Sequence, residues 1–181
     1  MDKRDYGIAE AWRETMQVME SPGLLMVTAD ADGKPNVMTI GWATLGIVWS
    51  KPILTAYVRP SRFTYGLVDS AGDFTVNVPS PGMAETVEFC GTKSGRDHDK
   101  FEERSLTAEA SRKVTSPVIR ECLLHYECKV VHENDVDPPA LAQDIKDSAY
   151  PQGDFHRIYF GEILAVYGVP DFEERVSKLP L

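Results

Sequence analysis

The feature that most constrains this chain is residues 36–64, in which two apolar runs lead directly into a turn rich in cations and hydroxyls, RPSRFT. Residues 36–48 and 53–58 are rich in β-branched and aromatic residues, and each run predicts a strand. The turn opens a predicted helix that ends near Gly72, with Ser61 as a suitable N-cap. A helix start carries free N–H groups and partial positive charge, so this turn either binds a phosphate or is a capped helix with solvated arginines.

Charge and cysteine content limit the classes of protein that this chain can be. It has 19 basic and 28 acidic residues, a formal net charge of −9, which opposes non-specific binding to nucleic acid or anionic membranes. A phosphate-bearing ligand would therefore need a locally positive pocket. The three cysteines form no CxxC pair, which favours a reducing compartment. Without a signal-peptide core or an apolar run of about 18 residues, we expect a cytoplasmic protein that does not span a membrane.

The order of the predicted elements indicates the fold class. Apolar patterning predicts helices at residues 8–19, 81–90 and 138–148, and strands at residues 24–29, 73–78, 123–131 and 155–169, the last with a bulge at Gly161. We expect about six or seven strands joined mostly by short turns, which fits an antiparallel β-barrel with helical additions better than a doubly wound sheet. The segment after Pro170 is expected to be exposed and weakly structured.

Residues 91–101, GTKSGRDHDKF, predict a loop rich in glycine, hydroxyls and cations. This loop is either a solvated connection or a ligand loop whose backbone N–H groups and Lys100 face an electron-rich group. The motifs GxGxxG after a strand, GxxxxGK[ST], HExxH and GxSxG are absent. The four histidines lie far apart, so we predict no metal site. Cys90 is either a reactive thiol or, as free cysteines more often are, a small buried hydrophobic residue.

Six separated segments together resemble one known family. They are NVMTIGWAT, SRFTYGLV, GDFTVNVP, CGTKSGRDHDKF, the SPVIREC to YECKVV stretch, and FHRIYFGEI. Their order resembles that of the flavin reductase-like, FMN-binding split-barrel proteins, and the flavoredoxin branch in particular, over residues 21–169. The resemblance implies an antiparallel split β-barrel over residues 21–169. With the N-terminal helix (1–20) and the tail (170–181) that the residue pattern predicts, we expect one mainly β domain of the α+β class over residues 1–181. The resemblance also implies a homodimer with non-covalent FMN near the subunit interface.

The resemblance carries over residue by residue to three segments. It implies that the flavin ring lies along Asn36, Met38, Thr39, Ile40, Gly41 and Trp42, that Ser61, Arg62 and Thr64 bind the phosphate, and that Ser94, Gly95, Arg96, Asp99 and Lys100 form a second FMN loop. Either Lys100 or Arg96 is expected to be the cation beside the N1–C2=O edge of the flavin. His156 resembles a histidine of the family's last long strand, but Phe155 is inserted before it, which leaves the direction of the imidazole open.

Three functions compete at this point. The first is an NAD(P)H-dependent flavin reductase-like oxidoreductase, in which bound flavin takes up hydride and no protein nucleophile is needed. The second is a flavoredoxin-type electron carrier that exchanges electrons with a protein partner. The third is an FMN-binding protein without redox turnover. The sequence contains no nicotinamide-binding fingerprint that decides between the first two.

Overall fold

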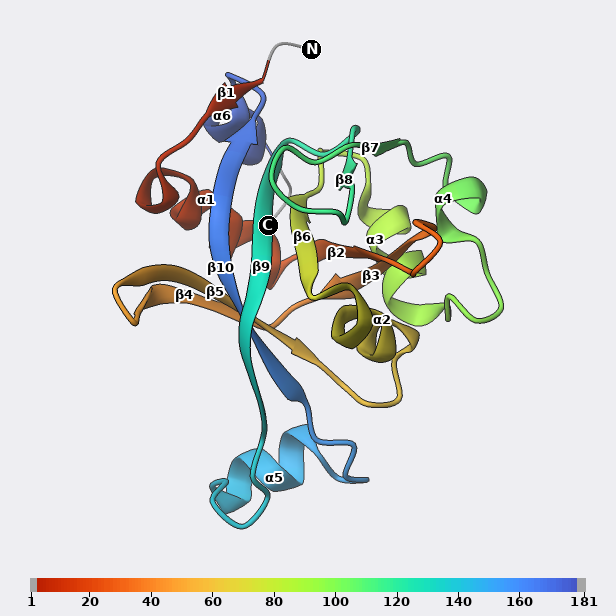
Figure 1. Cartoon of the computed structure of the whole chain (residues 1–181), viewed down its shortest axis with the longest axis vertical. Coiled ribbons are helices and arrows are strands. Elements are labelled where there is room, and N and C mark those ends of the chain that lie inside the picture. The colour runs from red at the N-terminus through yellow and green to blue at the C-terminus, as the bar shows by residue number, and fades with distance from the viewer. Residues whose placement is uncertain (1–2, 179–181) are drawn as a thin grey trace.

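The computed structural model describes residues 3–178, and its centre is an antiparallel sheet that curls without closing (Figure 1). The strands follow the order β3-β2-β6-β9-β10-β5-β4, with β1 added on β10, and β7 and β8 form a separate pair. The strands are β1 (Arg4–Asp5), β2 (Leu24–Ala29), β3 (Pro35–Ile40), β4 (Ala43–Val48), β5 (Lys51–Val58), β6 (Asp73–Val78), β7 (Ala108–Glu109), β8 (Val118–Ile119), β9 (Leu124–Asp135) and β10 (Arg157–Gly168). The predicted antiparallel split-barrel fold is confirmed.

The split in the barrel lies between β3 and β4, which are the two ends of the strand order. We predicted one strand over residues 36–48, and that prediction is wrong, because β3 ends at Ile40 and a separate strand, β4, begins at Ala43 at the opposite end of the strand order. Only Gly41 and Trp42 connect these two strands. The predicted number of strands, six or seven, was also too low. The strands β1, β7 and β8 have two residues each, which is too short to give a periodic pattern in the sequence.

The described part of the chain contains six helices in addition to the sheet. They are α1 (Ile8–Glu20), α2 (Phe63–Ala71), α3 (Ala84–Thr92), α4 (Lys100–Glu103), α5 (Gln143–Ala149) and α6 (Phe172–Val176). Between residues 3 and 178, no helix is long and apolar enough to cross a membrane. The predicted loop at residues 91–101 is shorter than expected, because α3 continues to Thr92 and α4 begins at Lys100. The predicted helix at residues 138–148 begins only at Gln143, because Pro138 and Pro139 lie in the preceding turn.

The prediction of an exposed, weakly structured tail is only partly correct for its described part, where most side chains are exposed but α6 forms and buries two of them. Phe172 and Val176 of α6 are fully buried, and Phe172 packs edge-to-face on Tyr6 with ring centroids 5.7 Å apart. Residues 179–181 of that tail lie outside the described residues. An amphipathic single turn is too short to produce a clear sequence signal, which explains the error.

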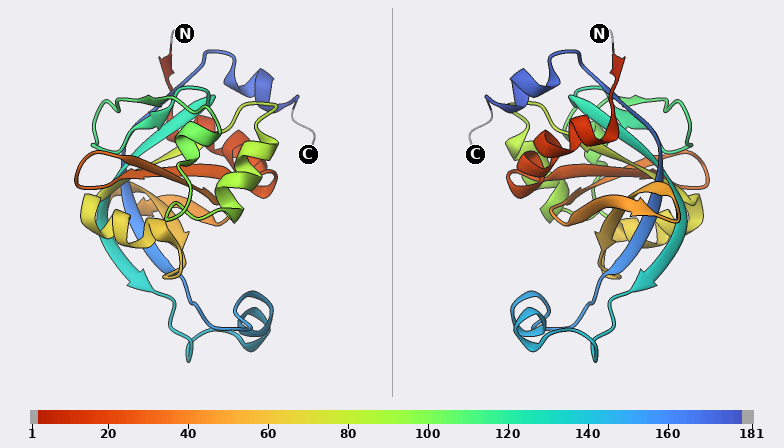
Figure 2. Two further views of the ribbon diagram at one scale, coloured as in Figure 1. Left: turned by 90° about the vertical axis from the view of Figure 1, so that its right-hand side faces the viewer. Right: turned by 90° about the vertical axis from the view of Figure 1, so that its left-hand side faces the viewer.

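The core has two parts on opposite faces of β2. Leu24 and Met26 face the inside of the curled sheet, where they join Phe74, Tyr126 and other residues of the main core. Leu25 and Val27 face outward into a second cluster, which includes Val87 of α3, Phe101 of α4, and Ile119 of β8. Figure 2 shows α3 and α4 against the side of the sheet that carries β2 and β3. Since α3 and α4 cover this outer face, they also bring the segment between them to the edge of β3.

Two long strands, β9 and β10, run through the middle of the sheet and continue beyond it (Figure 1). The chain between them carries α5, which hangs away from the barrel in both views of Figure 2 and has no buried residue. The predicted irregularity at Gly161 is confirmed, because the register of β10 against β9 shifts between Phe160 and Gly161. This long excursion brings residues 149–156 back beside the turn that precedes α2.

Candidate functional site

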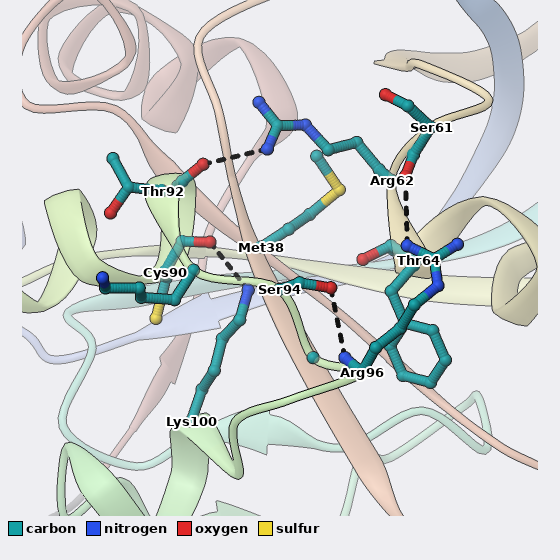
Figure 3. A pocket seen from close by; sticks show the side chains of 13 residues that line it. Met38, Ser61, Arg62, Thr64, Cys90, Thr92, Ser94, Arg96 and Lys100 are labelled. Atoms are coloured by element: carbon teal, nitrogen blue, oxygen red, sulfur yellow. Dashed lines mark hydrogen bonds between the residues drawn. The ribbon is translucent and has the colours of Figure 1, made fainter.

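Four cations surround a hollow of about 140 Å³ between the start of α2 and the segment that joins α3 to α4 (Figure 3). We call it the cation hollow; it is lined by Met38, Ser61, Arg62, Phe63, Thr64, Cys90, Gly91, Thr92, Lys93, Ser94, Gly95, Arg96 and Lys100. No carboxylate is among these residues, although the chain as a whole carries a net charge of −9. A local excess of positive charge in an acidic protein is the setting that a phosphate group requires.

Two arginines bridge the two walls of the cation hollow in opposite directions. Arg62, from the turn before α2, donates from Nη1 to the carbonyl oxygen of Gly91 at 3.1 Å. Arg96, from the opposite segment, donates from Nη1 to the carbonyl oxygen of Ser61 at 3.1 Å (Figure 3). Each guanidinium has five N–H donors, so one bond of this kind leaves donors for a ligand. The two bridges fix the width of the hollow.

Lys100 is buried beneath the same hollow, with 5% of its surface exposed. Its ammonium donates to the carbonyl oxygens of Val37 and Cys90, each at 2.8 Å. Burial, with a smaller contribution from Arg62, lowers the pKa of Lys100. Cys90 lies in the last turn of α3, whose final carbonyls have no partner within the helix, so Lys100 also acts as a cap of α3.

The contact with Val37 identifies the free edge of β3. In a strand, the N–H and C=O of one residue point to the same side, and alternate residues point to opposite sides. Because the Val37 carbonyl faces Lys100 rather than β2, the backbone groups of Thr39, two residues further along β3, also face away from β2. The backbone N–H groups of Val37 and Thr39 therefore point away from β2 on this edge strand.

The turn before α2 differs from its predicted capping. Ser61 is not the N-cap, which is Arg62 and makes no side-chain cap bond. Ser61 is instead held by Asp154, whose carboxylate accepts the Ser61 backbone N–H at 3.1 Å and the hydroxyl at 2.6 Å. Thr64 accepts a bond from the Asn36 amide at 2.8 Å, and its own O–H remains able to donate. The amide of Asn36 thus links β3 to α2.

A second hollow of about 210 Å³ adjoins the first and shares Met38 and Arg62 with it. We call it the ring hollow; it is lined by Met38, Thr39, Ile40, Gly41, Trp42, Tyr57, Arg59, Arg62 and His156. It lies at the split of the barrel, where Gly41 and Trp42 connect β3 to β4. The Trp42 and His156 rings lie 4.7 Å apart and are tilted by 45°.

His156 faces this ring hollow, and the inserted Phe155 turns the other way to stack on Tyr150 with ring centroids 4.7 Å apart. The Tyr150 hydroxyl and His156 Nδ1 form a hydrogen bond of 2.7 Å. Burial, reinforced by the positive charge of Arg59, lowers the pKa of His156 to about 4. The imidazole is therefore neutral at pH 7, and the pKa of Tyr150 is raised by its own burial.

The structure gathers most of the predicted site residues around the two hollows. Of the fourteen, Met38, Thr39, Ile40, Gly41, Trp42, Ser61, Arg62, Thr64, Ser94, Gly95, Arg96 and Lys100 line one or both. Asn36 and Asp99 do not; Asp99 caps α4 and pairs with Lys34 at 3.0 Å. The prediction had omitted Lys93, Tyr57 and Asp154. Lys93 stood within the predicted ligand loop, whereas nothing in the sequence indicates that Asp154 meets Ser61.

Comparison with known proteins shows which family the chain belongs to. Residues 19–179 match the family described as flavin reductase like domain. The chain belongs to this family. The predicted family membership is thus confirmed.

Three relatives illustrate the range of similarity. A protein of Archaeoglobus fulgidus is 36% identical over 133 residues, which are 74% of this chain but only 65% of that relative's length. The flavoredoxin of Desulfovibrio vulgaris (Miyazaki F) is 25% identical with a TM-score of 0.66, covering 83% of this chain and 70% of that one. An FMN-binding protein of Thermus thermophilus shares the fold with a TM-score of 0.62 at 21% identity, covering 80% of this chain and 68% of that one.

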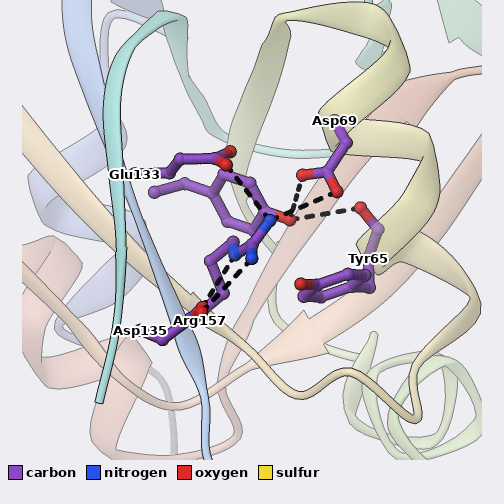
Figure 4. Close-up of polar contacts among 6 residues, drawn as sticks. Tyr65, Asp69, Glu133, Asp135 and Arg157 are labelled. Carbon is purple, nitrogen blue, oxygen red and sulfur yellow. Dashed lines mark hydrogen bonds and ion pairs between the residues drawn. The ribbon is translucent and has the colours of Figure 1, made fainter. Parts of the chain in front are cut away.

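In this flavin reductase-like chain, a charged cluster anchors the helix that begins at the site (Figure 4). Arg157 of β10 pairs with Asp135 at 2.8 Å, Glu133 at 3.1 Å and Asp69 at 3.4 Å. Tyr159 donates to the other oxygen of Asp69 at 2.6 Å. Since Asp69 belongs to α2, this cluster holds the body of the helix on β10 and so positions the turn at its N-terminus.

Two alternative kinds of site find no support in the described residues. Cys90 is buried, and burial raises the pKa of its thiol to about 11, so it stays protonated at neutral pH. Between residues 3 and 178, no cluster of three or more histidine, cysteine, aspartate or glutamate side chains is arranged to hold a metal ion.

Proposed function

We propose that this chain binds FMN non-covalently, with the phosphate in the cation hollow and the isoalloxazine ring in the ring hollow. The observation that carries the proposal is the pairing of these hollows. One contains Arg62, Lys93, Arg96 and Lys100 without a carboxylate, and the adjoining one lies beside the Trp42 ring. A ligand with a phosphate at one end and a flat aromatic system at the other matches that arrangement.

The chain's own groups have distinct roles in this proposal. Arg62 borders both hollows, so it can contact the phosphate side and the ring side of one ligand. The backbone N–H group of Thr39 supplies a donor at the free edge of β3. Lys100 is already bonded to two carbonyl oxygens, so its charge acts on the site from a fixed position.

Bound FMN supplies hydride or single-electron transfer, for which the protein provides binding and electrostatics. We propose a flavin reductase-like oxidoreductase that takes its electrons from NAD(P)H. The alternative is an electron carrier supplied by a redox protein, which the similarity to a flavoredoxin favours. In either case, two groups are the candidates for tuning the reduction potential of the flavin: the neutral imidazole of His156 and the ammonium group of Lys100. His156 borders the ring hollow as an uncharged donor or acceptor.

Phosphate recognition is tested by comparing FMN with riboflavin, which lacks the phosphate. Purified apoprotein is titrated with each ligand, and flavin fluorescence quenching gives the affinity. We expect wild-type protein to prefer FMN by about a hundredfold, and Arg62→Ala to remove about tenfold or more of that preference. Arg104→Ala is the matched control, because this arginine pairs with Glu85 outside both hollows. If the protein binds neither FMN nor riboflavin, the proposal is wrong.

The electron donor is tested by mixing the FMN-loaded protein anaerobically with NADH or NADPH in a stopped-flow instrument. Bleaching of the flavin absorbance within milliseconds to seconds supports the reductase. A spectrum that persists with both nucleotides but bleaches with dithionite supports the carrier. Resistance to all three reductants would indicate an FMN-binding protein without redox turnover.

We also propose a homodimer, on the basis of the apolar tip of the β4–β5 hairpin. Ile47 and Trp49 are 74% and 58% exposed at this tip, and Val48 lies between them. Contiguous exposed apolar residues commonly mark protein interfaces. Sedimentation velocity distinguishes a dimer from a monomer, and Ile47→Glu combined with Trp49→Glu should shift the protein to the monomer.

A further inference from the structure

Tyr150 connects the ring hollow to the chain between β9 and β10, which carries α5. Its backbone N–H bonds the carbonyl oxygen of Lys146 at 3.0 Å at the end of this helix. The chain then turns through Gly153 and Asp154, with φ of 77° and 58°, and returns His156 to the side of the Tyr150 ring. The two rings lie 5.5 Å apart at an angle of 75°. Tyr150 therefore contacts the histidine that borders the ring hollow.

Two further contacts fix the position of the Tyr150 ring. Phe155, the residue inserted before His156, stacks on it with ring centroids 4.7 Å apart and planes 25° apart. The guanidinium of Arg59 lies 5.0 Å from the ring centre, within cation–π range, and also bonds the carbonyl oxygen of Ala149 at 2.9 Å. Tyr150 is buried, with 5% of its surface exposed. Its hydroxyl is thus held 2.7 Å from Nδ1 of His156.

The direction of this hydrogen bond follows from the partners that each group has. Burial raises the pKa of Tyr150, against smaller opposing effects of Arg59 and of the His156 backbone N–H. The phenol therefore keeps its proton at neutral pH, and among residues 3–178 the only acceptor within hydrogen-bond distance of it is His156 Nδ1. The phenol oxygen, in contrast, already has that backbone N–H as a donor. The phenol O–H consequently donates, and Nδ1 accepts.

This assignment determines where the imidazole carries its proton. Burial, reinforced by Arg59, lowers the pKa of His156 to about 4, so the ring is neutral at pH 7 and an accepting Nδ1 leaves the proton on Nε2. His156 Nε2 has no hydrogen-bond partner among the described residues. The only fully buried side-chain polar atom of those residues that lacks a partner is His125 Nε2, so His156 Nε2 is accessible. The space that it borders is the ring hollow.

We propose that Tyr150 is a positioning residue that fixes His156 as the Nε2–H tautomer, so that the ring hollow presents a neutral N–H donor to a carbonyl oxygen of its ligand. The opposite tautomer would present a lone pair, which repels a carbonyl oxygen. A neutral imidazole donates this hydrogen bond without giving up its proton, so His156 polarises the carbonyl group and does not act as an acid. The inference rests on the proposed flavin binding only for the identity of the ligand, because the tautomer is a property of the ligand-free protein.

The tautomer is measured from the ¹⁵N chemical shifts of the His156 ring in ligand-free protein labelled with ¹⁵N-histidine, with His156→Gln to assign the signals. At pH 7 we expect a protonated Nε2 and an unprotonated Nδ1. A protonated Nδ1 in the wild-type protein would overturn the inference without any further variant.

Tyr150→Phe tests the positioning role, because phenylalanine keeps the ring that stacks on Phe155 but lacks the hydroxyl. It should lower the ratio of the Nε2–H to the Nδ1–H tautomer about tenfold, the effect of losing one hydrogen bond that only the first tautomer accepts. Tyr57→Phe is the matched control, since the Tyr57 ring lies edge-on at 6.2 Å from the same imidazole without a hydrogen bond to it. An unchanged ratio in Tyr150→Phe would show that Tyr150 only fills space.

The carbonyl group can belong to the isoalloxazine ring or to a second molecule beside it, and two additions separate these sources. A downfield shift of the His156 Nε2–H proton on saturation with FMN assigns the carbonyl to the flavin. A shift that appears only when duroquinone, an uncharged ring with two carbonyl groups, is added to the FMN-loaded protein assigns it to a second molecule. No shift with either would overturn the carbonyl contact. If FMN does not bind at all, the proposed function is wrong, whereas the tautomer of the ligand-free protein is decided separately.

Discussion

Asp154 holds Ser61 with both oxygens of its carboxylate, one on the backbone N–H at 3.1 Å and the other on the hydroxyl at 2.6 Å. Asp154 adopts a left-handed conformation with φ of 58°, which costs free energy for a residue other than glycine. Arg59 secures the same loop by donating to the Asp154 and Ala149 carbonyl oxygens. The Asp154 carboxylate therefore accepts hydrogen bonds from two donors of Ser61, in the turn that we propose as the phosphate site.

Replacing Asp154 by asparagine should strengthen FMN binding. Asparagine retains the shape and an oxygen for the Ser61 N–H but removes a negative charge close to the phosphate. We expect FMN affinity to rise about three- to tenfold, near 1 kcal/mol, and riboflavin affinity to stay unchanged. Fluorescence titration measures both. Asp147→Asn, on the exposed face of α5, is the control. Weaker FMN binding in Asp154→Asn would mean that the carboxylate supports the turn rather than competing for it.

Lys100→Met tests whether the buried ammonium tunes the flavin. Methionine keeps the apolar stem but leaves the Val37 and Cys90 carbonyl oxygens without their donor. We expect a lower unfolding free energy by about 2 kcal/mol and a more negative midpoint potential of bound FMN, because a cation near reduced flavin is lost. Urea unfolding and spectroelectrochemistry measure these effects. Lys51→Met, in an exposed pair with Glu162, should change neither appreciably. An unaltered potential in Lys100→Met would refute the tuning role.

Much of this site could be predicted from local sequence, because single segments supply most of each wall. The RPSRFT turn and the loop around Ser94 to Lys100 contain their cations within a few residues, so spacing alone reveals them. The family resemblance then predicts that both segments bind one flavin. The sequence could not reveal contacts that depend on the topology of the fold. One example is the hydrogen bond between Ser61 and Asp154, two residues that are 93 positions apart in the chain.

The break at Gly41 and Trp42 shows a second limit of local patterns. The residues on both sides of this break are apolar and β-branched, so the strand-like pattern of the sequence continues across it. The break is nevertheless the point where the chain passes from β3 to β4, the two ends of the strand order. The buried end of α6 was missed for the opposite reason, since Phe172 and Val176 form one short turn with almost no periodic signal. Both errors concern tertiary placement of segments whose composition was interpreted correctly.

Gly161→Ala should destabilise the barrel. A Cβ at this position would lie 2.6 Å from Phe74 Cζ and 2.7 Å from Cys128 Cβ, in the main core. Because neither the ring nor the strand can retreat freely in a close-packed interior, we expect a loss of about 1–3 kcal/mol in unfolding free energy. Gly46→Ala is the matched control, since it is a strand glycine with nothing within 4 Å of the added Cβ. Equal stability of the two variants in urea unfolding would contradict this account of the bulge.

His125 should make folding stability depend on pH. The imidazole is fully buried, its Nδ1 bonds the Asn77 side-chain oxygen at 2.8 Å, and its Nε2 has no partner among the described residues. Burial, reinforced by Lys3, lowers its pKa to about 3. Between the ordinary histidine pKa of about 6.5 and that value, the unfolded chain binds a proton that the folded chain does not. Stability therefore falls as pH falls through this window.

The variant His125→Gln isolates this contribution, because glutamine can still donate to Asn77 but does not titrate. From pH 7 to pH 5, wild-type protein should lose about 2 kcal/mol more unfolding free energy than the variant does. Urea unfolding at pH 7, 6 and 5 gives the comparison, with His132→Gln as an exposed-histidine control that should follow the wild-type slope. Parallel curves for wild type and His125→Gln would show that His125 takes up a proton in the folded protein as readily as in the unfolded chain.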